Sequence, residues 1–234
     1  MTPSHSGGIP APLLCTALDD AARRLNAGGL LVYPTETFYG IGCRADHAEA
    51  VLRVFAAKRR APDMPLPLIL ASADQLSLVA ALEPAHEAAV QRLASFWPAP
   101  LTLLLPVRAD LPAALTAGTG KIAVRVSAHP AARALAEACA FPVVSSSANI
   151  SGRPAVTSAA SLDPDLRSFL ASGPEPDGVF DPSHAFPEAL APGGGMASTI
   201  VEPAGCGSTS TLRVLREGAL PLSQLAEAGF TFLP

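Results

Sequence analysis

The stretch Gly28–Arg44, GGLLVYPTETFYGIGCR, decides how the rest of the sequence is interpreted. Two glycines precede an apolar run over residues 30–33, which predicts a strand buried on both faces. Pro34 cannot donate a hydrogen bond to a sheet, so we expect this strand to end there or to lie at an edge. The stretch therefore predicts a sheet whose first long strand is in the core.

The turn after this strand carries hydroxyl and carboxylate groups. Thr35, Glu36 and Thr37 follow the predicted carboxyl end of the strand, where open α/β sheets usually bind their ligands. We interpret residues 39–42, which include two glycines, as a loop that lets a ligand approach the backbone. On its own, the stretch slightly favours an ordinary connection in which the glycines serve only the turn.

Composition indicates a globular protein. The chain has 234 residues, of which 49% are hydrophobic and 15% charged, enough to bury a substantial core. The net charge of −4 gives no overall field that would attract nucleic acid or an anionic membrane. We expect residues 1–12, rich in Ser, Gly and Pro, to form a flexible N-terminus and residues 13–234 to form a single domain.

The cysteines and the N-terminus indicate a cytoplasmic protein. Cys15, Cys43, Cys139 and Cys206 are scattered, which predicts buried free thiols rather than disulfides or a zinc site. None of the five histidines has a partner at catalytic or metal-binding spacing, so we expect them at the surface and predict no protein metal site. No secretion signal and no run long enough to span a membrane is present.

Helical and strand patterns alternate along the chain, which predicts one α/β domain. Predicted helices cover 19–26, 46–60, 73–81, 85–96, 130–139, 165–170 and 222–228, and predicted strands cover 30–33, 66–71, 101–105, 122–126, 143–144, 198–201 and 212–215. Asp46 and Glu49 form a capping-box pattern for the second helix, with Val51, Leu52, Val54 and Phe55 facing the core. The Pro- and Gly-rich segment 173–195 is either a functional lid or a mobile excursion.

One cluster of positively charged residues and one single arginine are candidates for binding anions. Lys58, Arg59 and Arg60 end the second predicted helix, where the dipole favours cations for structural reasons. Cations at positions i and i+2 beside a rigid Pro-rich strap also suit a polyphosphate. Arg125 lies in the apolar run AVRV, and we expect with equal weight that it pairs with an internal acid such as Glu36 or binds an anionic ligand.

A third candidate is the polar loop Ser145–Gly152, SSSANISG, which follows a short strand. Such loops present backbone N–H and hydroxyl groups that hold phosphates. By itself, an ordinary turn explains this loop better.

Seven short motifs follow one another from residue 33 to residue 218. They are YPTETFYGIG at 33–42, K-x-R-x-x-D-x-P-L at 58–66, FWPAPLTLLLP at 96–106, AVRV at 123–126, SSSANISGRP at 145–154, STIV at 198–201 and LRVLREG at 212–218. In this order and spacing, the chain resembles the YrdC-like family of threonylcarbamoyl-AMP synthases. Each motif is modest by itself, and the series is specific.

The resemblance implies an α/β fold: a single domain with a twisted mixed parallel/antiparallel sheet, flanked by helices, and a large concave site. It implies that L-threonine, bicarbonate and ATP are converted to threonylcarbamoyl-AMP and pyrophosphate. The product would pass to a tRNA-modifying threonylcarbamoyl transferase complex that acts on the adenosine next to the anticodon. It also implies that Mg²⁺ accompanies the phosphates and that the chain is a short form without the extra C-terminal domain of longer relatives.

The resemblance also implies roles for individual residues. Threonine would be bound by Thr37, Arg125, Ser145 and Ser198, and ATP by Lys58, Arg60, Ser147, Asn149 and Arg216. Lys58 and Arg60, expected at an exposed helix end, would be catalytic because they stabilise charge on the phosphates. Arg125 would pair with the carboxylate of threonine. The sequence departs from the family pattern at Met64, where relatives often have Asn or Lys, and at Ile69, where some have His.

Two other functions are consistent with this fold. One is an RNA-binding module without synthase activity, with weak RNA binding, although the acidic charge and the lack of interleaved aromatic and basic residues disfavour it. The other is a carbamoyl-transferring relative with a different substrate, which the short chain disfavours.

Overall fold

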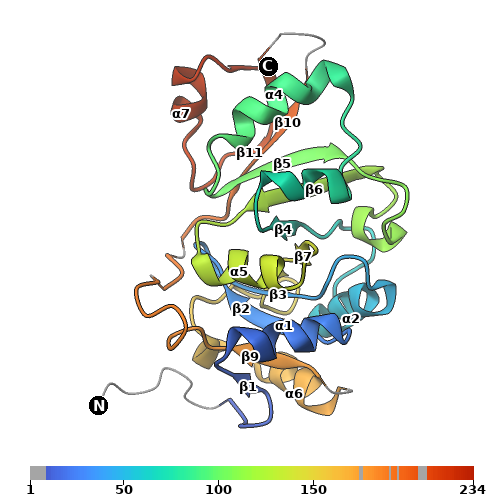
Figure 1. The fold of residues 1–234 in the computed structure, drawn as a ribbon, viewed down its shortest axis with the longest axis vertical. Coiled ribbons are helices and arrows are strands. Elements are labelled where there is room, and N and C mark those ends of the chain that lie inside the picture. The colour runs from blue at the N-terminus through green and yellow to red at the C-terminus, as the bar shows by residue number, and fades with distance from the viewer. Residues whose placement is uncertain (1–8, 174–175, 190, 194, 205–209) are drawn as a thin grey trace.

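The computed structural model describes residues 9–173, 176–189, 191–193, 195–204 and 210–234. It is an elongated α/β structure in which two sheets lie one above the other along the long axis (Figure 1). The N-terminal end of the chain is at the bottom of this view and the C-terminal end is at the top.

Seven α-helices and twelve strands make up the described part of the chain. The helices are α1 (Leu18–Asn26), α2 (Ala48–Lys58), α3 (Leu76–Val79), α4 (Pro84–Ala94), α5 (Pro130–Ala138), α6 (Pro164–Ser172) and α7 (Leu222–Glu227). The strands are β1 (Leu14–Cys15), β2 (Leu31–Pro34), β3 (Tyr39–Gly42), β4 (Leu68–Leu70), β5 (Leu101–Pro106), β6 (Lys121–Val126), β7 (Val143–Val144), β8 (Ser146–Ser147), β9 (Gly178–Phe180), β10 (Thr199–Pro203), β11 (Thr211–Arg216) and β12 (Thr231–Phe232). Short 3-10 turns cover Ala73–Gln75, Ala113–Thr116 and Ala159–Ser161.

The lower sheet has five strands in the order β1-β9-β2-β3-β8. Strand β2 is parallel to β9 and antiparallel to β3, with which it forms the hairpin that holds the Thr-Glu-Thr turn. Residues 30–33 are fully buried, and β2 ends at Pro34, as the sequence predicts.

The upper sheet has seven strands in the order β12-β11-β10-β5-β6-β4-β7. Its central strand pairs are β10 with β5, which are parallel, and β5 with β6, which are antiparallel. The predicted mixed α/β fold is therefore confirmed, with the strands divided between two mixed sheets rather than gathered in one.

The segment Val143–Ser147 contributes to both sheets. Its first half, β7, pairs with β4 in the upper sheet, and its second half, β8, pairs with β3 in the lower sheet. Between them, the amide of Ser145 donates a hydrogen bond to the carbonyl of Pro67 at 2.8 Å. This crossing fixes the distance between the sheets.

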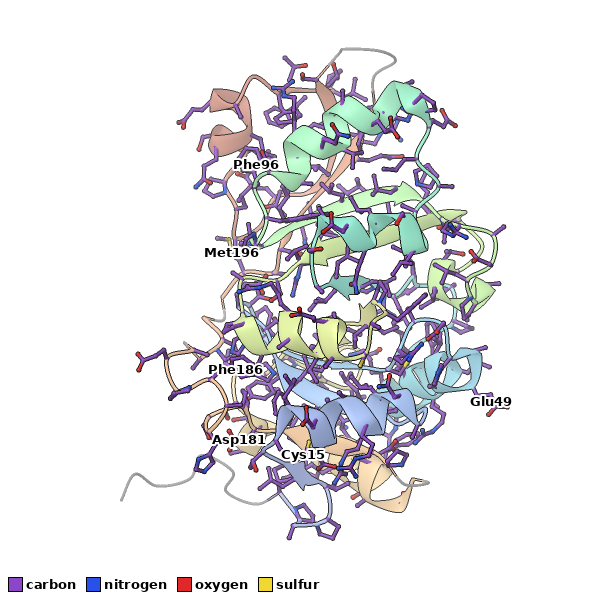
Figure 2. The ribbon with its side chains drawn as sticks, viewed as in Figure 1. Cys15, Glu49, Phe96, Asp181, Phe186 and Met196 are labelled. Carbon is purple, nitrogen blue, oxygen red and sulfur yellow. The ribbon has the colours of Figure 1, made fainter. Side chains whose placement is uncertain are left out.

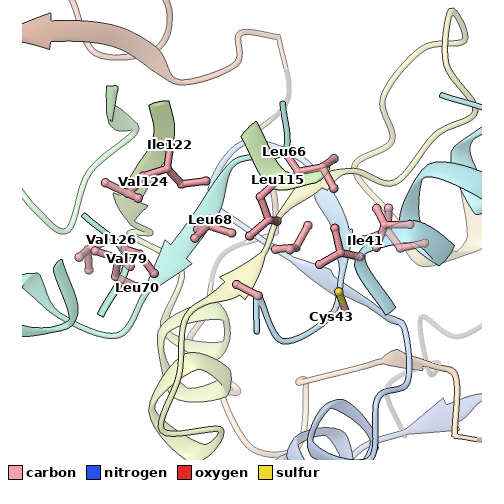
Figure 3. Close-up of a cluster of buried hydrophobic side chains, with 14 of the residues drawn as sticks. Ile41, Cys43, Leu66, Leu68, Leu70, Val79, Leu115, Ile122, Val124 and Val126 are labelled. Atoms are coloured by element: carbon pink, nitrogen blue, oxygen red, sulfur yellow. The ribbon is translucent and has the colours of Figure 1, made fainter. Parts of the chain in front are cut away.

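One hydrophobic cluster includes buried side chains of both sheets. Figure 3 shows Ile41 and Cys43, from β3 and its end, beside Leu68 of β4 and Leu115, with Val124 of β6 further along the same cluster. A second cluster joins α1 and α5 to β2 and includes the fully buried Tyr33. At about 25 cal/mol per Å² of apolar surface, such shared burial is the main force holding the sheets together.

Three details of the sequence prediction are wrong. Helix α2 begins after His47, without a side-chain cap from Asp46, and Leu52 is 56% exposed, so the predicted capping box and four-residue apolar face do not form. Residues 39–42 form a strand instead of a loop. The segment 173–195 contains β9, a buried strand between β1 and β2, so its first half is neither a lid nor an excursion.

The sequence did not predict β9 because this strand has only three residues. It is anchored by the buried Asp177, whose carboxylate accepts a hydrogen bond from the amide of Leu30 at 2.8 Å and lies 2.5 Å from a guanidinium nitrogen of Arg53. Polar contacts of this kind leave no hydrophobic period in the sequence. The sequence predicts a flexible N-terminus over residues 1–12, and residues 1–8 of this segment lie outside the described residues.

The crossing segment passes so close to Gly42 that a side chain cannot be placed there. A Cβ at position 42 would lie 1.5 Å from the carbonyl oxygen of Val144. We predict that Gly42→Ala lowers the free energy of unfolding by about 2–3 kcal/mol or more, because two backbones must move apart. Urea unfolding would measure it. Gly193→Ala is the matched control, since its Cβ would come no nearer than 3.6 Å to another atom, and an equal loss in both variants would contradict this account.

Candidate active site

A cavity of about 730 Å³ lies where the two sheets meet. The turn and strands β3 and β8 of the lower sheet form one wall, and the upper sheet forms the floor. Seven of the nine residues predicted to bind substrates line it: Thr37, Arg60, Arg125, Ser145, Ser147, Ser198 and Arg216. The other two, Lys58 and Asn149, are close behind its wall.

Side chains alternate between the two faces of the upper sheet, and this alternation decides which residues form the cavity floor. In β6, Ile122, Val124 and Val126 belong to the hydrophobic core, and the alternate residues Lys121, Ala123 and Arg125 line the cavity. Strand β5 behaves in the same way, with Thr102 and Leu104 on the cavity side. The charge of Arg125 in an apolar run is therefore explained, because it lies on the opposite face from its apolar neighbours.

Arg125 has an acidic neighbour from the other sheet. Its Nε lies 3.5 Å from Oε1 of Glu36, and both side chains are mostly buried, with exposed fractions of 12% and 14%. Neither of these two atoms has a hydrogen-bond partner among the described residues. The other carboxylate oxygen of Glu36 accepts a hydrogen bond from the hydroxyl of Ser127. The expected pairing of Arg125 with Glu36 is thus present, and Arg125 also lines the cavity.

Arg216 is held on the floor beside Ser198. Its Nε and one terminal nitrogen donate to the carbonyl of Ser198 at 3.0 and 2.8 Å, and the hydroxyls of Ser198 and Thr102 are 2.8 Å apart. Burial, and then the nearby charge of Arg125, lower the pKa of Arg216. Two cations in one partly desolvated space repel each other, which an anionic ligand would relieve.

The opposite wall offers small hydroxyl groups. The Oγ1 of Thr35 donates to the carbonyl of Phe38 at 2.7 Å and lies 3.2 Å from the hydroxyl of Thr37, which fixes the turn. Ser145 and Ser147 also line this wall. They flank Ser146, which pairs with Ile41 of β3. Gly40 also lines the cavity, and a Cβ at this position would lie 3.0 Å from Oγ of Ser145.

Lys58 is buried, which corrects the expectation of a cation at an exposed helix end. It is 1% exposed, and its ammonium donates to the carbonyls of Ser147 and Asn149, the latter at 2.7 Å. Burial, and then the charge of Arg60, lower the pKa of Lys58 to about 7. Asn149 in turn donates through its amide to the carbonyls of Ile150 and Arg153. Lys58 and Asn149 therefore shape the Ser145–Gly152 loop from behind.

Arg60 reaches the cavity from the strap that follows α2. A terminal nitrogen donates to the carbonyl of Pro65 at 2.9 Å, and its Nε is buried without a hydrogen-bond partner among the described residues. Burial lowers the pKa of Arg60, an effect that Asp63 opposes. An unpaired buried donor on a cation is costly unless a ligand accepts from it.

The cavity is positively charged although the chain is acidic. Its charged lining residues are Arg60, Lys121, Arg125, Arg213, Arg216 and Glu202. Among the described lining residues Glu202 is the single carboxylate, and it pairs with Lys121 of β6 and Arg213 of β11. The sequence did not predict Lys121, Glu202, Arg213 and Thr102 as lining residues, although the two-residue alternation that starts from Arg125 points directly to Lys121.

Comparison with known proteins assigns the family. The Sua5–YciO–YrdC family model, described as "Telomere recombination", matches residues 23–218. The chain belongs to this family. Threonylcarbamoyl-AMP synthase of Xanthomonas euvesicatoria is 42% identical over 167 residues, which are 70% of this chain and 84% of that protein. The enzyme of the same name from Pyrococcus abyssi is 44% identical over 139 residues, 59% of this chain and 40% of that one.

Solved structures agree with this assignment. P. abyssi Sua5 in complex with L-threonine superimposes with a TM-score of 0.76 at 33% identity, covering 93% of this chain and 59% of that one. The present chain thus spans about three fifths of that protein. Escherichia coli YciO, at 22% identity and a TM-score of 0.65, shares the fold.

Other sequence expectations concern residues away from the cavity. Cys15, Cys43 and Cys139 are buried free thiols, as predicted, and Cys206 lies outside the described residues. His129 is buried, contrary to expectation, and its ring accepts a hydrogen bond from the amide of Ala131 at the start of α5. No cluster of three or more His, Cys, Asp or Glu suited to a metal occurs among the described residues. None of the described helices has the length and hydropathy needed to cross a membrane.

The buried position of Lys58 predicts a large effect on stability. We expect Lys58→Ala to lower the free energy of unfolding by about 2–4 kcal/mol, because it leaves two carbonyls unsatisfied and a cavity behind. Arg59→Gln is the matched control: its side chain is 63% exposed and pairs with Asp165 at 3.2 Å, so the loss should stay below about 1 kcal/mol. Denaturant unfolding at pH 8 tests both, and a Lys58→Ala variant as stable as Arg59→Gln would contradict the buried geometry.

The same lysine predicts a pH dependence. Its pKa falls from 10.5 to about 7 on folding, so between these values the unfolded chain holds a proton that the folded chain has released. Stability should therefore rise with pH across this window, by up to about 1.4 kcal/mol per pH unit. The Lys58→Met variant has no ionisable group at this position, so its stability should lack this contribution to the pH dependence. Unfolding free energies measured from pH 7 to 9.5 should diverge between the two proteins, and parallel curves would refute the shift.

Proposed function

We propose that this chain synthesises threonylcarbamoyl-AMP from L-threonine, bicarbonate and ATP, with release of pyrophosphate. One observation carries the proposal: in an acidic chain, five cationic side chains and a single carboxylate line one cavity between the sheets. One of these cations, Arg125, has a side chain that is 12% exposed, and the hydroxyl residues Thr37, Ser145 and Ser198 line the same cavity. Such a lining suits an amino acid carboxylate next to a polyphosphate.

Threonine would bind at the end of the cavity where Arg125 lies beside Glu36, which is called the inner end below. Arg125 would pair with its carboxylate in a two-pronged contact. Thr37, Ser145 and Ser198 would surround the rest of the amino acid. Ile69, where some relatives have His, is fully buried and in register with Arg125 on the neighbouring strand, so it offers the cavity no polar group and no exposed surface.

ATP would occupy the remainder of the cavity, with its phosphates near Arg60 and Arg216. Ser147 belongs to the wall, and Lys58 and Asn149 would act on the nucleotide by holding the loop that carries Ser147. We propose this indirect role for Lys58 and Asn149 in place of the direct contact that the family resemblance implies.

The reaction needs no nucleophilic side chain. The amine of threonine forms a bond to the carbon of bicarbonate, a carbon–oxygen bond of bicarbonate breaks, and water leaves with the proton that the nitrogen loses, which gives a carbamate. A carbamate oxygen then attacks the α-phosphorus, the bond to the β-phosphate oxygen breaks, and pyrophosphate leaves. Arg60 and Arg216 would stabilise charge on the phosphates, and the enclosed site would align the carbamate with the α-phosphorus.

Mg²⁺ and the partners follow from this chemistry. The one carboxylate of the cavity is already paired with two cations, so the described residues do not suit a protein-held metal, and Mg²⁺ would enter bound to the phosphates. The product is a reactive mixed anhydride, which a tRNA-modifying threonylcarbamoyl transferase complex in the cytoplasm would consume. RNA binding by this chain itself would be weak.

The deciding experiment is pyrophosphate release by the purified chain. We expect release only when ATP, bicarbonate and L-threonine are all present, and no comparable rate with any of the other nineteen amino acids. Omission of each substrate in turn is the control. Equal turnover without threonine would rule the proposal out.

A further inference from the structure

Glu36 connects three parts of the molecule that meet at the inner end of the cavity. It lies on the turn between β2 and β3, its carboxylate contacts Ser127 and Arg125 at the end of β6, and its carbonyl accepts a hydrogen bond from the amide of Gly193 at 3.0 Å. Gly193 precedes Ser198, which lines the cavity. Glu36 itself does not line it.

The carboxylate of Glu36 is held in place from behind. Ser127 donates its hydroxyl hydrogen to Oε2 and accepts a hydrogen bond from the amide of His129 at 3.2 Å. Arg133 of α5 donates to the carbonyl of Ser127 at 2.7 Å. The first turn of α5 therefore orients Ser127, and Ser127 orients Glu36.

The other carboxylate oxygen of Glu36, Oε1, lies beside Arg125. Oε1 of Glu36 and Nε of Arg125 are 3.5 Å apart, both are buried, and neither has another partner among the described residues. Arg125 also lies near the like charge of Arg216, which pushes the two guanidinium groups apart. The attraction to Glu36 opposes this repulsion, and it acts at the Nε of a residue that also lines the cavity.

We infer that Glu36 is the positioning residue that holds Arg125 ready for the carboxylate of the amino acid substrate. The inference rests on the proposed function, whose amino acid site it makes more specific. An arginine side chain has many rotamers, and fixing it before binding removes an entropic cost from the binding step. Loss of Glu36 should therefore weaken amino acid binding and leave nucleotide binding nearly unchanged.

The test compares Glu36→Gln with Glu49→Gln. The first keeps the size of the side chain and an oxygen that accepts from Ser127, and removes the charge that faces Arg125. The second makes the same change on an exposed residue at the start of α2, at the edge of the molecule in Figure 2. Steady-state kinetics with each substrate varied in turn, calorimetric binding of L-threonine alone, and melting temperatures are measured for both.

We expect Glu36→Gln to raise the threonine KM and Kd about tenfold, as for one weakened charged contact, with the ATP KM changed less than about twofold. Glu49→Gln should match the wild type. A fall in kcat with both KM values unchanged would overturn the inference, and so would equal rises in the two KM values. If Glu36→Gln does not fold, Ser127→Ala replaces it, with a rise of about threefold expected in the threonine KM.

A double-mutant cycle separates positioning from a merely local effect. If Glu36 acts through Arg125, the variant with both Glu36→Gln and Arg125→Met should bind threonine no more weakly than Arg125→Met alone. Additive losses would overturn the inference. A wild-type protein that shows no threonine-dependent pyrophosphate release would instead defeat the proposed function, so the two failures are distinguishable.

Discussion

The crossing of residues 143–147 from one sheet to the other is the constraint on which the cavity depends. Strand β7 closes the edge of the upper sheet and β8 closes the edge of the lower one, and the single residue Ser145 separates them. The hydroxyl of Tyr33 donates to the carbonyl of Val144, and the ammonium of Lys58 holds the carbonyl of Ser147. The sheets therefore cannot slide past each other without breaking buried polar contacts, which keeps the two walls of the cavity at a fixed separation.

The carboxylates near the cavity cancel only part of the repulsion between its positively charged side chains. Glu36 and Glu202 each face cations of the floor, one at the inner end and one at the outer end. Neither Arg60 nor Arg216 forms a salt bridge within the described part of the chain, and burial lowers the pKa of both. Met64, Met196 and Leu215 are exposed, the first and last of them in the cavity lining; Figure 2 shows Met196 at the height where the two sheets meet. A largely apolar cavity that carries several cations and few carboxylates favours ligands that have several negative charges and an apolar part.

The sequence predicted those parts of the fold that repeat along the chain. Helices α1, α4 and α5 and strands β2, β5 and β6 were predicted close to their observed bounds, because each has a clear hydrophobic period or a glycine or proline at its end. Strands β1, β8, β9 and β12 have two or three residues, too few for a period, and pairing alone defines them. Lys58 illustrates a different limit: nothing in KRR shows which of three cations turns inward, since that depends on a loop ninety residues away.

Alternation on the upper sheet has a consequence for how this protein can change. Each of β5, β6 and β10 contributes one set of side chains to the core and the other set to the cavity. Substitution at Leu104, Ala123 or Ile200 alters the shape that a ligand meets without removing a core contact of its neighbours in sequence. Substrate preference and folding stability are therefore encoded in interleaved but separate positions, so that one can be altered by mutation while the other is preserved.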